Sequence, residues 1–251
     1  MFSRLFDIFY APYAVAAFTA VAVPACAFII VAPTLTLRRN LGRCGMRAAL
    51  LCMGVPLRVH GLENLPPGAC IAVANHTSYL DGLILTAALP SRFTFVVQDG
   101  AAGWPLIGPT IRRMGATFVN RSAPREGAKQ TRALIRRVQE GESFAVFAEG
   151  TFKAEPGLLP FKNGAFMMAV RAQVPVVPVG ITGTRRLWGG HNHLPRWSAV
   201  TVRILPAIAP VGAHKEAETH LRDAVRAEVL KLCGEPDRAH AAQTDPMPDE
   251  N

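Results

Sequence analysis

Residues 70–82 read CIAVANHTSYLDG, and the fold of the chain can be worked out from this stretch. A short apolar run, residues 70–74, is typical of a buried strand, and residues 82–89 are composed like a helix. The polar loop between them carries His76 and ends at Asp81. On a single helix, two residues five positions apart diverge by about 140°. We therefore expect His76 on the loop and Asp81 in the first helical turn, where the two side chains can meet.

A paired histidine and aspartate have a specific chemistry. If Asp81 accepts a hydrogen bond from one imidazole nitrogen of His76, it fixes the tautomer and leaves the other nitrogen as a general base. The alternative is a core histidine, with Asp81 only favouring the start of the helix. The spacing alone is a weak signal, so the choice between these interpretations depends on the rest of the chain.

Short β-branched or aromatic runs alternate with amphipathic stretches beyond residue 69. The runs predict strands at residues 93–97, 143–147, 176–181 and 200–205. The amphipathic stretches predict helices at residues 125–140 and 217–232. Strands that alternate with helices in this way indicate an α/β domain with a central sheet.

The N-terminal region differs from the rest. Thirty residues, 8–37, carry no formal charge, which exceeds the roughly 20 apolar residues needed to cross a bilayer core. Pro24 lies in the middle, so either a kinked span or a helical hairpin in one leaflet fits the sequence. The run is longer than the core of a cleaved signal peptide. Arginines cluster directly after it, so we expect the cytoplasmic (inner) membrane, with the rest of the chain on the cytoplasmic side.

The charge is uneven and favours anionic partners. The net charge is +9, although residues 234–251 hold five acidic residues and one basic residue. Anionic lipid and phosphorylated metabolites fit such an excess better than nucleic acid, because no nucleic-acid-binding motif accompanies it. The five cysteines form no C-x-x-C pair. We expect three parts: a membrane-embedded and interfacial segment (1–60), an α/β domain (61–233) and a disordered acidic tail (234–251).

Four motifs occur in a fixed order along the chain. They are NHTSYLD (75–81), GATFVNR (115–121), FAEGT (147–151) and VPVVPVGI (174–181). This order resembles the glycerolipid acyltransferase family, which includes the 1-acylglycerol-3-phosphate acyltransferases. The resemblance implies a central mixed sheet flanked by helices, behind an N-terminal membrane helix or helical hairpin.

The resemblance also implies roles for individual residues. His76 would be the catalytic base and Asp81 would orient it. The second and third motifs would hold the phosphate of the acceptor through Arg121 and through Glu149, Gly150 and Thr151. The third motif usually reads FPEGTR, whereas this chain has Ala148 in place of the proline and Phe152 in place of the arginine. The guanidinium of that arginine could bind a phosphate. Lys153 or Arg121 is then left to hold the phosphate.

The expected reaction moves an acyl group from a thioester to the hydroxyl of a lyso-glycerolipid in the membrane. The donor is acyl-coenzyme A or acyl carrier protein, and no metal or other cofactor is expected. The acceptor is 1-acyl-sn-glycerol-3-phosphate or another lyso-lipid, such as lyso-ornithine lipid, because Phe152 departs from the motif. The rival hypothesis is a non-catalytic, membrane-anchored protein that binds anionic lipid.

Overall fold

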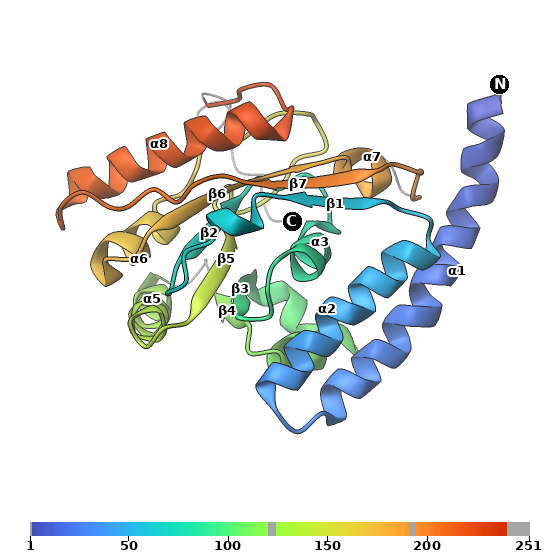
Figure 1. Cartoon of the computed structure of the whole chain (residues 1–251), viewed down its shortest axis with the longest axis horizontal. Coiled ribbons are helices and arrows are strands. Elements are labelled where there is room, and N and C mark those ends of the chain that lie inside the picture. The colour runs from blue at the N-terminus through green and yellow to red at the C-terminus, as the bar shows by residue number, and fades with distance from the viewer. Residues whose placement is uncertain (1, 120–123, 191–193, 240–251) are drawn as a thin grey trace, which may run out of the picture.

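The computed structural model describes residues 2–119, 124–190 and 194–239. At its centre lies a seven-stranded sheet in the order β1-β7-β6-β2-β5-β3-β4 (Figure 1). The strands are β1 Leu57–His60, β2 Ile71–Ala74, β3 Phe93–Gln98, β4 Thr117–Val119, β5 Ser143–Phe147, β6 Val176–Thr182 and β7 Val200–Ile204. Strand β7 is antiparallel to β6, whereas the other neighbours pair in parallel. The predicted α/β fold with a central mixed sheet is confirmed.

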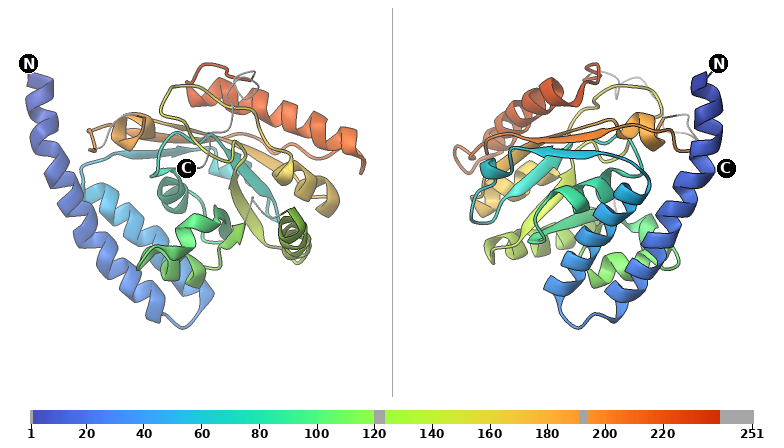
Figure 2. Two further views of the ribbon diagram at one scale, coloured as in Figure 1. Left: turned by 180° about the vertical axis from the view of Figure 1, so that it is seen from behind. Right: turned by 45° about the vertical axis from the view of Figure 1, so that its right-hand side comes forward.

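Helices cover both faces of this sheet (Figure 2). They are α1 Phe2–Val31, α2 Leu35–Cys52, α3 Asp81–Ala88, α4 Ile107–Arg113, α5 Pro124–Gln139, α6 Gly164–Ala172, α7 Thr184–Trp188 and α8 Lys215–Cys233, with short 3-10 turns η1 Leu62–Asn64 and η2 Asp99–Gly103. Strand β2 shows why two layers form. Ile71 and Val73 point into one core with α5, α6 and α8, whereas Ala72 and Ala74 point into the other with α2 and α3.

The N-terminal helices form a hairpin that is attached to the domain. Helix α1 is uninterrupted despite Pro12 and Pro24, and α2 returns alongside it (Figure 1). Near the start of α1, the Tyr10 hydroxyl donates to the Met53 carbonyl at 3.1 Å. Near its end, Arg113 Nε donates to the Ile30 carbonyl at 2.9 Å. Among the described residues, α1 is the one helix long and apolar enough to cross a membrane, over Phe6–Val31.

Helix α2 is fastened to the edge of the sheet by a buried arginine. Arg39 is 8% exposed, donates from Nε to the Met114 carbonyl at 3.0 Å and pairs with Glu142 at 3.2 Å. Partial burial acts to raise the pKa of Glu142, but hydrogen bonds and charges from Arg137 and Arg39 outweigh it, and the pKa is lowered. An ionised Glu142 therefore holds the hairpin against the domain.

The limits of the three parts differ from the expected ones. Strand β1 pairs with β7 along Leu57–His60, so the sheet begins before the predicted division at residues 60 and 61. Residues 235–239 are ordered against the domain, because Glu235 pairs with Arg185 at 2.7 Å and Asp237 pairs with Arg226 at 2.6 Å. The rest of the tail that is expected to be disordered, residues 240–251, lies outside the described residues.

Candidate active site

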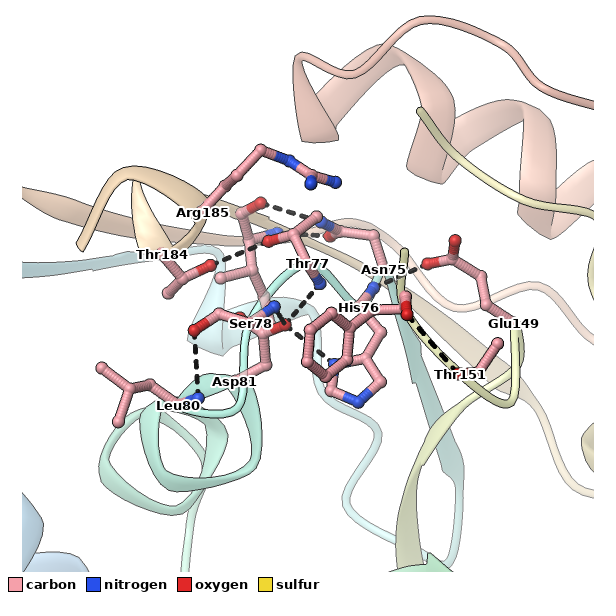
Figure 3. A network of polar contacts seen from close by, with 12 residues as sticks. Asn75, His76, Thr77, Ser78, Leu80, Asp81, Glu149, Thr151, Thr184 and Arg185 are labelled. Carbon is pink, nitrogen blue, oxygen red and sulfur yellow. Dashed lines mark hydrogen bonds and ion pairs between the residues drawn. The ribbon is translucent and has the colours of Figure 1, made fainter. Parts of the chain in front are cut away.

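Three neighbouring strands bring the site together. Strand β2 lies between β5 and β6 and is parallel to both, so the carboxyl ends of all three strands share one edge of the sheet. His76 follows β2, Glu149 follows β5, and Thr184 follows β6. Residues far apart in the sequence therefore meet at this edge, as Figure 3 shows.

The predicted pair of His76 and Asp81 is present in the structure. His76 Nδ1 lies 2.9 Å from Asp81 Oδ2, with His76 on the loop and Asp81 the first residue of α3. The same oxygen accepts the backbone N–H groups of Thr77 at 2.6 Å and Ser78 at 2.8 Å. An ionised carboxylate can only accept, so the proton of a neutral imidazole lies on Nδ1. Nε2 is then left with a lone pair that can accept a proton.

Side chains of the loop itself fix its path. Asn75 extends the pairing of β2 with β6, because its amide donates to the Ile181 carbonyl at 3.0 Å and accepts from the Ile181 N–H at 2.7 Å. The Thr77 and Thr184 hydroxyl groups lie 3.0 Å apart. The Ser78 hydroxyl donates to the Trp188 carbonyl and accepts from the Leu80 N–H. These polar groups are buried and paired, so the loop is held on several sides.

Glu149 lies behind the loop and faces the protein interior. It is 3% exposed, and its two carboxylate oxygens accept the backbone N–H groups of His76 at 2.6 Å and Leu159 at 2.8 Å. Burial raises the pKa of Glu149 to about 7, although the two backbone donors act to lower it. A buried carboxylate with both oxygens occupied is not placed to hold a phosphate. In the structure, Glu149 instead supports the backbone of His76 through the bond that the His76 N–H group donates.

Aromatic rings enclose the imidazole of His76. Phe147 stacks on it with ring centroids 4.2 Å apart and planes 16° apart. Phe152 approaches edge-on at 4.8 Å and also contacts Tyr79 at 4.7 Å. Tyr79 is 72% exposed, so it stands at the opening of the site. The space beside His76 is therefore lined by aromatic carbon where the motif usually has a guanidinium.

The other residues predicted to bind the acceptor occupy different positions. Gly150 is buried with φ +81°, a backbone conformation that favours glycine. Thr151 and Lys153 are exposed at the rim. Arg121 lies outside the described residues.

Arg185, which the sequence did not predict as part of the site, supports the loop after Gly150. Arg185 donates to the carbonyls of Lys153 at 3.1 Å and Ala154 at 2.9 Å, and its Nε pairs with Glu235. These bonds hold the loop after Gly150 against α7. No local pattern in the sequence links residue 185 to residue 153, because their contact depends on how β5 and β6 are placed.

Comparison with known proteins shows which family the chain resembles. The family model described as Acyltransferase matches residues 56–182. The lyso-ornithine lipid O-acyltransferase of Rhizobium meliloti is 31% identical over 220 residues, covering 79% of this chain and 73% of that protein. The 1-acyl-sn-glycerol-3-phosphate acyltransferase of Saccharomyces cerevisiae is 29% identical over 191 residues, covering 75% and 63%. The chain thus spans less than two thirds of the yeast protein, and it spans 38% of a chloroplast relative from Brassica napus.

A solved structure shares the fold. The crystal structure of the 1-acyl-sn-glycerophosphate (LPA) acyltransferase PlsC from Thermotoga maritima superimposes with a TM-score of 0.73 at 21% identity. The match covers 92% of this chain and 97% of that one, so it includes the N-terminal hairpin as well as the sheet. The family match contains His76, Asp81 and Glu149 with the strands that carry them. The chain belongs to the acyltransferase family.

Proposed function

We propose that this protein transfers a fatty acyl group from a thioester to the hydroxyl of a lyso-lipid, with His76 as the general base. The observation that carries the proposal is the His76–Asp81 contact of 2.9 Å at the strand ends, inside the segment that matches the family. The free Nε2 of His76 takes the proton of the acceptor hydroxyl as that oxygen attacks the thioester carbonyl. The tetrahedral intermediate then expels the thiolate, which takes the proton back from Nε2 and leaves as a thiol.

The acceptor we propose first is 1-acyl-sn-glycerol-3-phosphate, the substrate named for most of the relatives. Arg121 and Lys153 are the cations we assign to its phosphate. A lyso-ornithine lipid is the second candidate, and two observations favour it. The relative named for that acceptor is matched over 79% of this chain. Phe152 places an aromatic edge beside His76, where a phosphate-binding guanidinium is expected.

We also propose that the hairpin of α1 and α2 holds the enzyme on one leaflet of the cytoplasmic membrane. Only 11% of the most apolar window of α1 is buried inside the protein, so its remaining surface needs an apolar environment. Helix α1 is bonded to the end of α2 through Tyr10 and to α4 of the domain through Arg113, and α2 returns alongside it. A helical hairpin held against the domain in this way suits attachment to one leaflet better than a crossing. Washing membranes with carbonate should not release the protein, and its recovery in the supernatant would oppose this assignment.

A transfer assay tests the proposed activity. The purified full chain in lipid nanodiscs is supplied with acyl-coenzyme A or acyl carrier protein donors and a panel of lyso-lipids, and the products are identified by mass spectrometry. We expect a diacylated product that His76→Ala does not form. Anionic-lipid binding by both proteins, with no product from either, would support the rival hypothesis of a non-catalytic lipid-binding protein.

A further inference from the structure

A short apolar segment follows the end of β3, at the edge of the sheet that carries His76. It comprises Trp104, Pro105 and Leu106, which follow η2, and Ile107, the first residue of α4, and all four residues are exposed. Trp104 is 52% exposed, Leu106 36% and Ile107 41%. Four consecutive exposed apolar residues lower solubility and are not expected on a water-facing surface unless they have a function.

The backbone of this segment is strained. Leu106 has φ +64° and ψ −48°, and the Ile107 N–H donates to the Pro105 carbonyl at 2.7 Å. This is the rarer form of γ-turn, which non-glycine residues seldom adopt. Such a conformation costs about 1–3 kcal/mol and persists where the surrounding structure holds it, often at functional sites. Here the strained residue is an exposed leucine, so the turn presents an apolar side chain to the outside.

The carbonyl groups of the segment need no water. The Trp104 carbonyl accepts from the Gly108 N–H at 2.9 Å. The Leu106 carbonyl accepts from the Thr110 N–H at 3.1 Å and from its hydroxyl at 2.7 Å. With the Pro105 carbonyl in the γ-turn, three successive carbonyls are satisfied within the segment. Satisfied carbonyl groups lower the cost of placing this loop in an apolar phase.

The helix that follows the segment packs against the candidate membrane helix. Helix α4, which begins at Ile107, packs against α1 (Figure 2). Arg113 at the end of α4 donates to the Ile30 and Ala32 carbonyls. In the same half of α1, Phe28 is 63% and Val31 is 74% exposed. Arg112 and Arg113 are exposed just beyond the apolar residues. Apolar residues followed by arginines match a bilayer interface, where acyl chains lie beneath anionic headgroups.

We propose that Trp104–Ile107 is a third membrane-inserting element, beside the hairpin of α1 and α2, and that it seats the active-site edge of the sheet in the bilayer interface. The proposal rests on the membrane attachment assigned to the hairpin in the proposed function. It adds a docking point on the catalytic side of the sheet, so a lyso-lipid can reach His76 from the leaflet without crossing water. The partner is a lipid surface that contains anionic headgroups.

The three tryptophans of the chain allow a direct test. The full chain with Trp188→Phe and Trp197→Phe keeps Trp104 as its only tryptophan, and a matched chain keeps only Trp188, which packs against the core. Both are bound to phosphatidylcholine vesicles containing phosphatidylglycerol, with bromine atoms on the acyl chains. We expect bromine to quench Trp104 and to leave Trp188 nearly unchanged. If the protein floats with the vesicles while aqueous acrylamide still quenches the fluorescence of Trp104, the segment Trp104–Ile107 does not insert, whereas the hairpin still anchors the protein. If the protein does not float, both assignments fall.

Two further measurements guard against effects on folding. In the unmodified chain, amide hydrogen exchange over residues 104–113 should slow when vesicles are added. If this protection is already present in detergent and grows with protein concentration, a second copy covers the segment and the proposal is overturned.

Leu106→Gly removes the apolar side chain and relieves the strained turn. It should keep thermal stability equal or higher and yet weaken vesicle binding about tenfold, equivalent to about 1.4 kcal/mol. Unchanged vesicle binding by this variant would refute the insertion of Leu106.

Discussion

The ring of Phe152 meets the imidazole of His76 edge-on, with centroids 4.8 Å apart. Phe147 stacks on the same imidazole, so the histidine is held between aromatic rings as well as by Asp81. A residue at position 152 therefore contacts the proposed base directly, although the motif usually has a phosphate-binding arginine there. The same contact gives Phe152 influence over which acceptor headgroup can approach Nε2.

Phe152→Arg should shift acceptor preference toward 1-acyl-sn-glycerol-3-phosphate. A guanidinium adds charge-assisted hydrogen bonds to a phosphomonoester, each worth about 1.5–3 kcal/mol. The apparent KM for that acceptor should fall by about tenfold, since 1.4 kcal/mol corresponds to one decade. Kinetics with paired lyso-lipids measure the change, and Phe152→Leu serves as the control that removes the ring without adding charge. An equal improvement with Phe152→Leu would mean that the ring merely obstructs the site.

Asp81→Asn should lower kcat by at least about 10²-fold, the lower range for impairing a general base. Asp81 Oδ2 accepts from His76 Nδ1 and from two backbone N–H groups. The amide oxygen of asparagine is uncharged, so it binds these donors more weakly and cannot stabilise the imidazolium that forms when Nε2 takes a proton. His76→Ala should have an effect of similar size. Asp223→Asn, an exposed aspartate on α8, is the matched control. Near-normal turnover by a folded Asp81→Asn enzyme would remove the proposed mechanism.

The stability that Glu149 contributes should fall as the pH rises. Its pKa is about 7 in the folded protein against 4.5 as the ordinary value, so folding takes up a proton between these two pH values. The contribution is complete below pH 4.5 and is lost as the pH passes 7, a change of roughly 3 kcal/mol at about 1.36 kcal/mol per pKa unit. Denaturant unfolding of the wild type and Glu149→Gln, which does not titrate, measures the difference at each pH. A wild type that gains stability relative to Glu149→Gln as the pH rises would mean that the two backbone donors outweigh burial.

Much of the fold could be predicted because the core elements carry strong local patterns. Strand β5 was predicted at its observed bounds, Ser143–Phe147, and β2 and β6 to within one residue. The edge strands β1 and β4 were missed, because they are three or four residues long and only partly buried. Their pairing depends on neighbours that arrive from distant parts of the chain.

The catalytic pair could be predicted from the sequence, but the packing around it could not. His76 and Asp81 are five residues apart, and a strand, loop and helix determine how they meet. The buried position of Glu149 depends on Leu159 and on the loop after β2, which only the folded sheet brings together. The motif marked Glu149 as important without indicating which way its side chain points. Residues such as Asn75 carry no signal apart from their place in the motif.

Gly180→Ala should destabilise the protein by about 1–3 kcal/mol, the usual cost of overpacking a core. A Cβ atom at Gly180 in β6 would lie 2.3 Å from the Cβ of Leu232 and 3.2 Å from its backbone, so α8 would have to move away from the sheet. At this chain length, each kcal/mol lowers Tm by roughly 2–4 °C. Gly164→Ala is the matched control, because nothing lies within 4 Å of a Cβ there and it begins α6. Gly180 also precedes Ile181, which bonds to Asn75 through both backbone groups, so a displaced β6 should lower kcat as well. A Gly180→Ala protein with the Tm and turnover of the Gly164→Ala control would show that α8 is not packed against β6 as described.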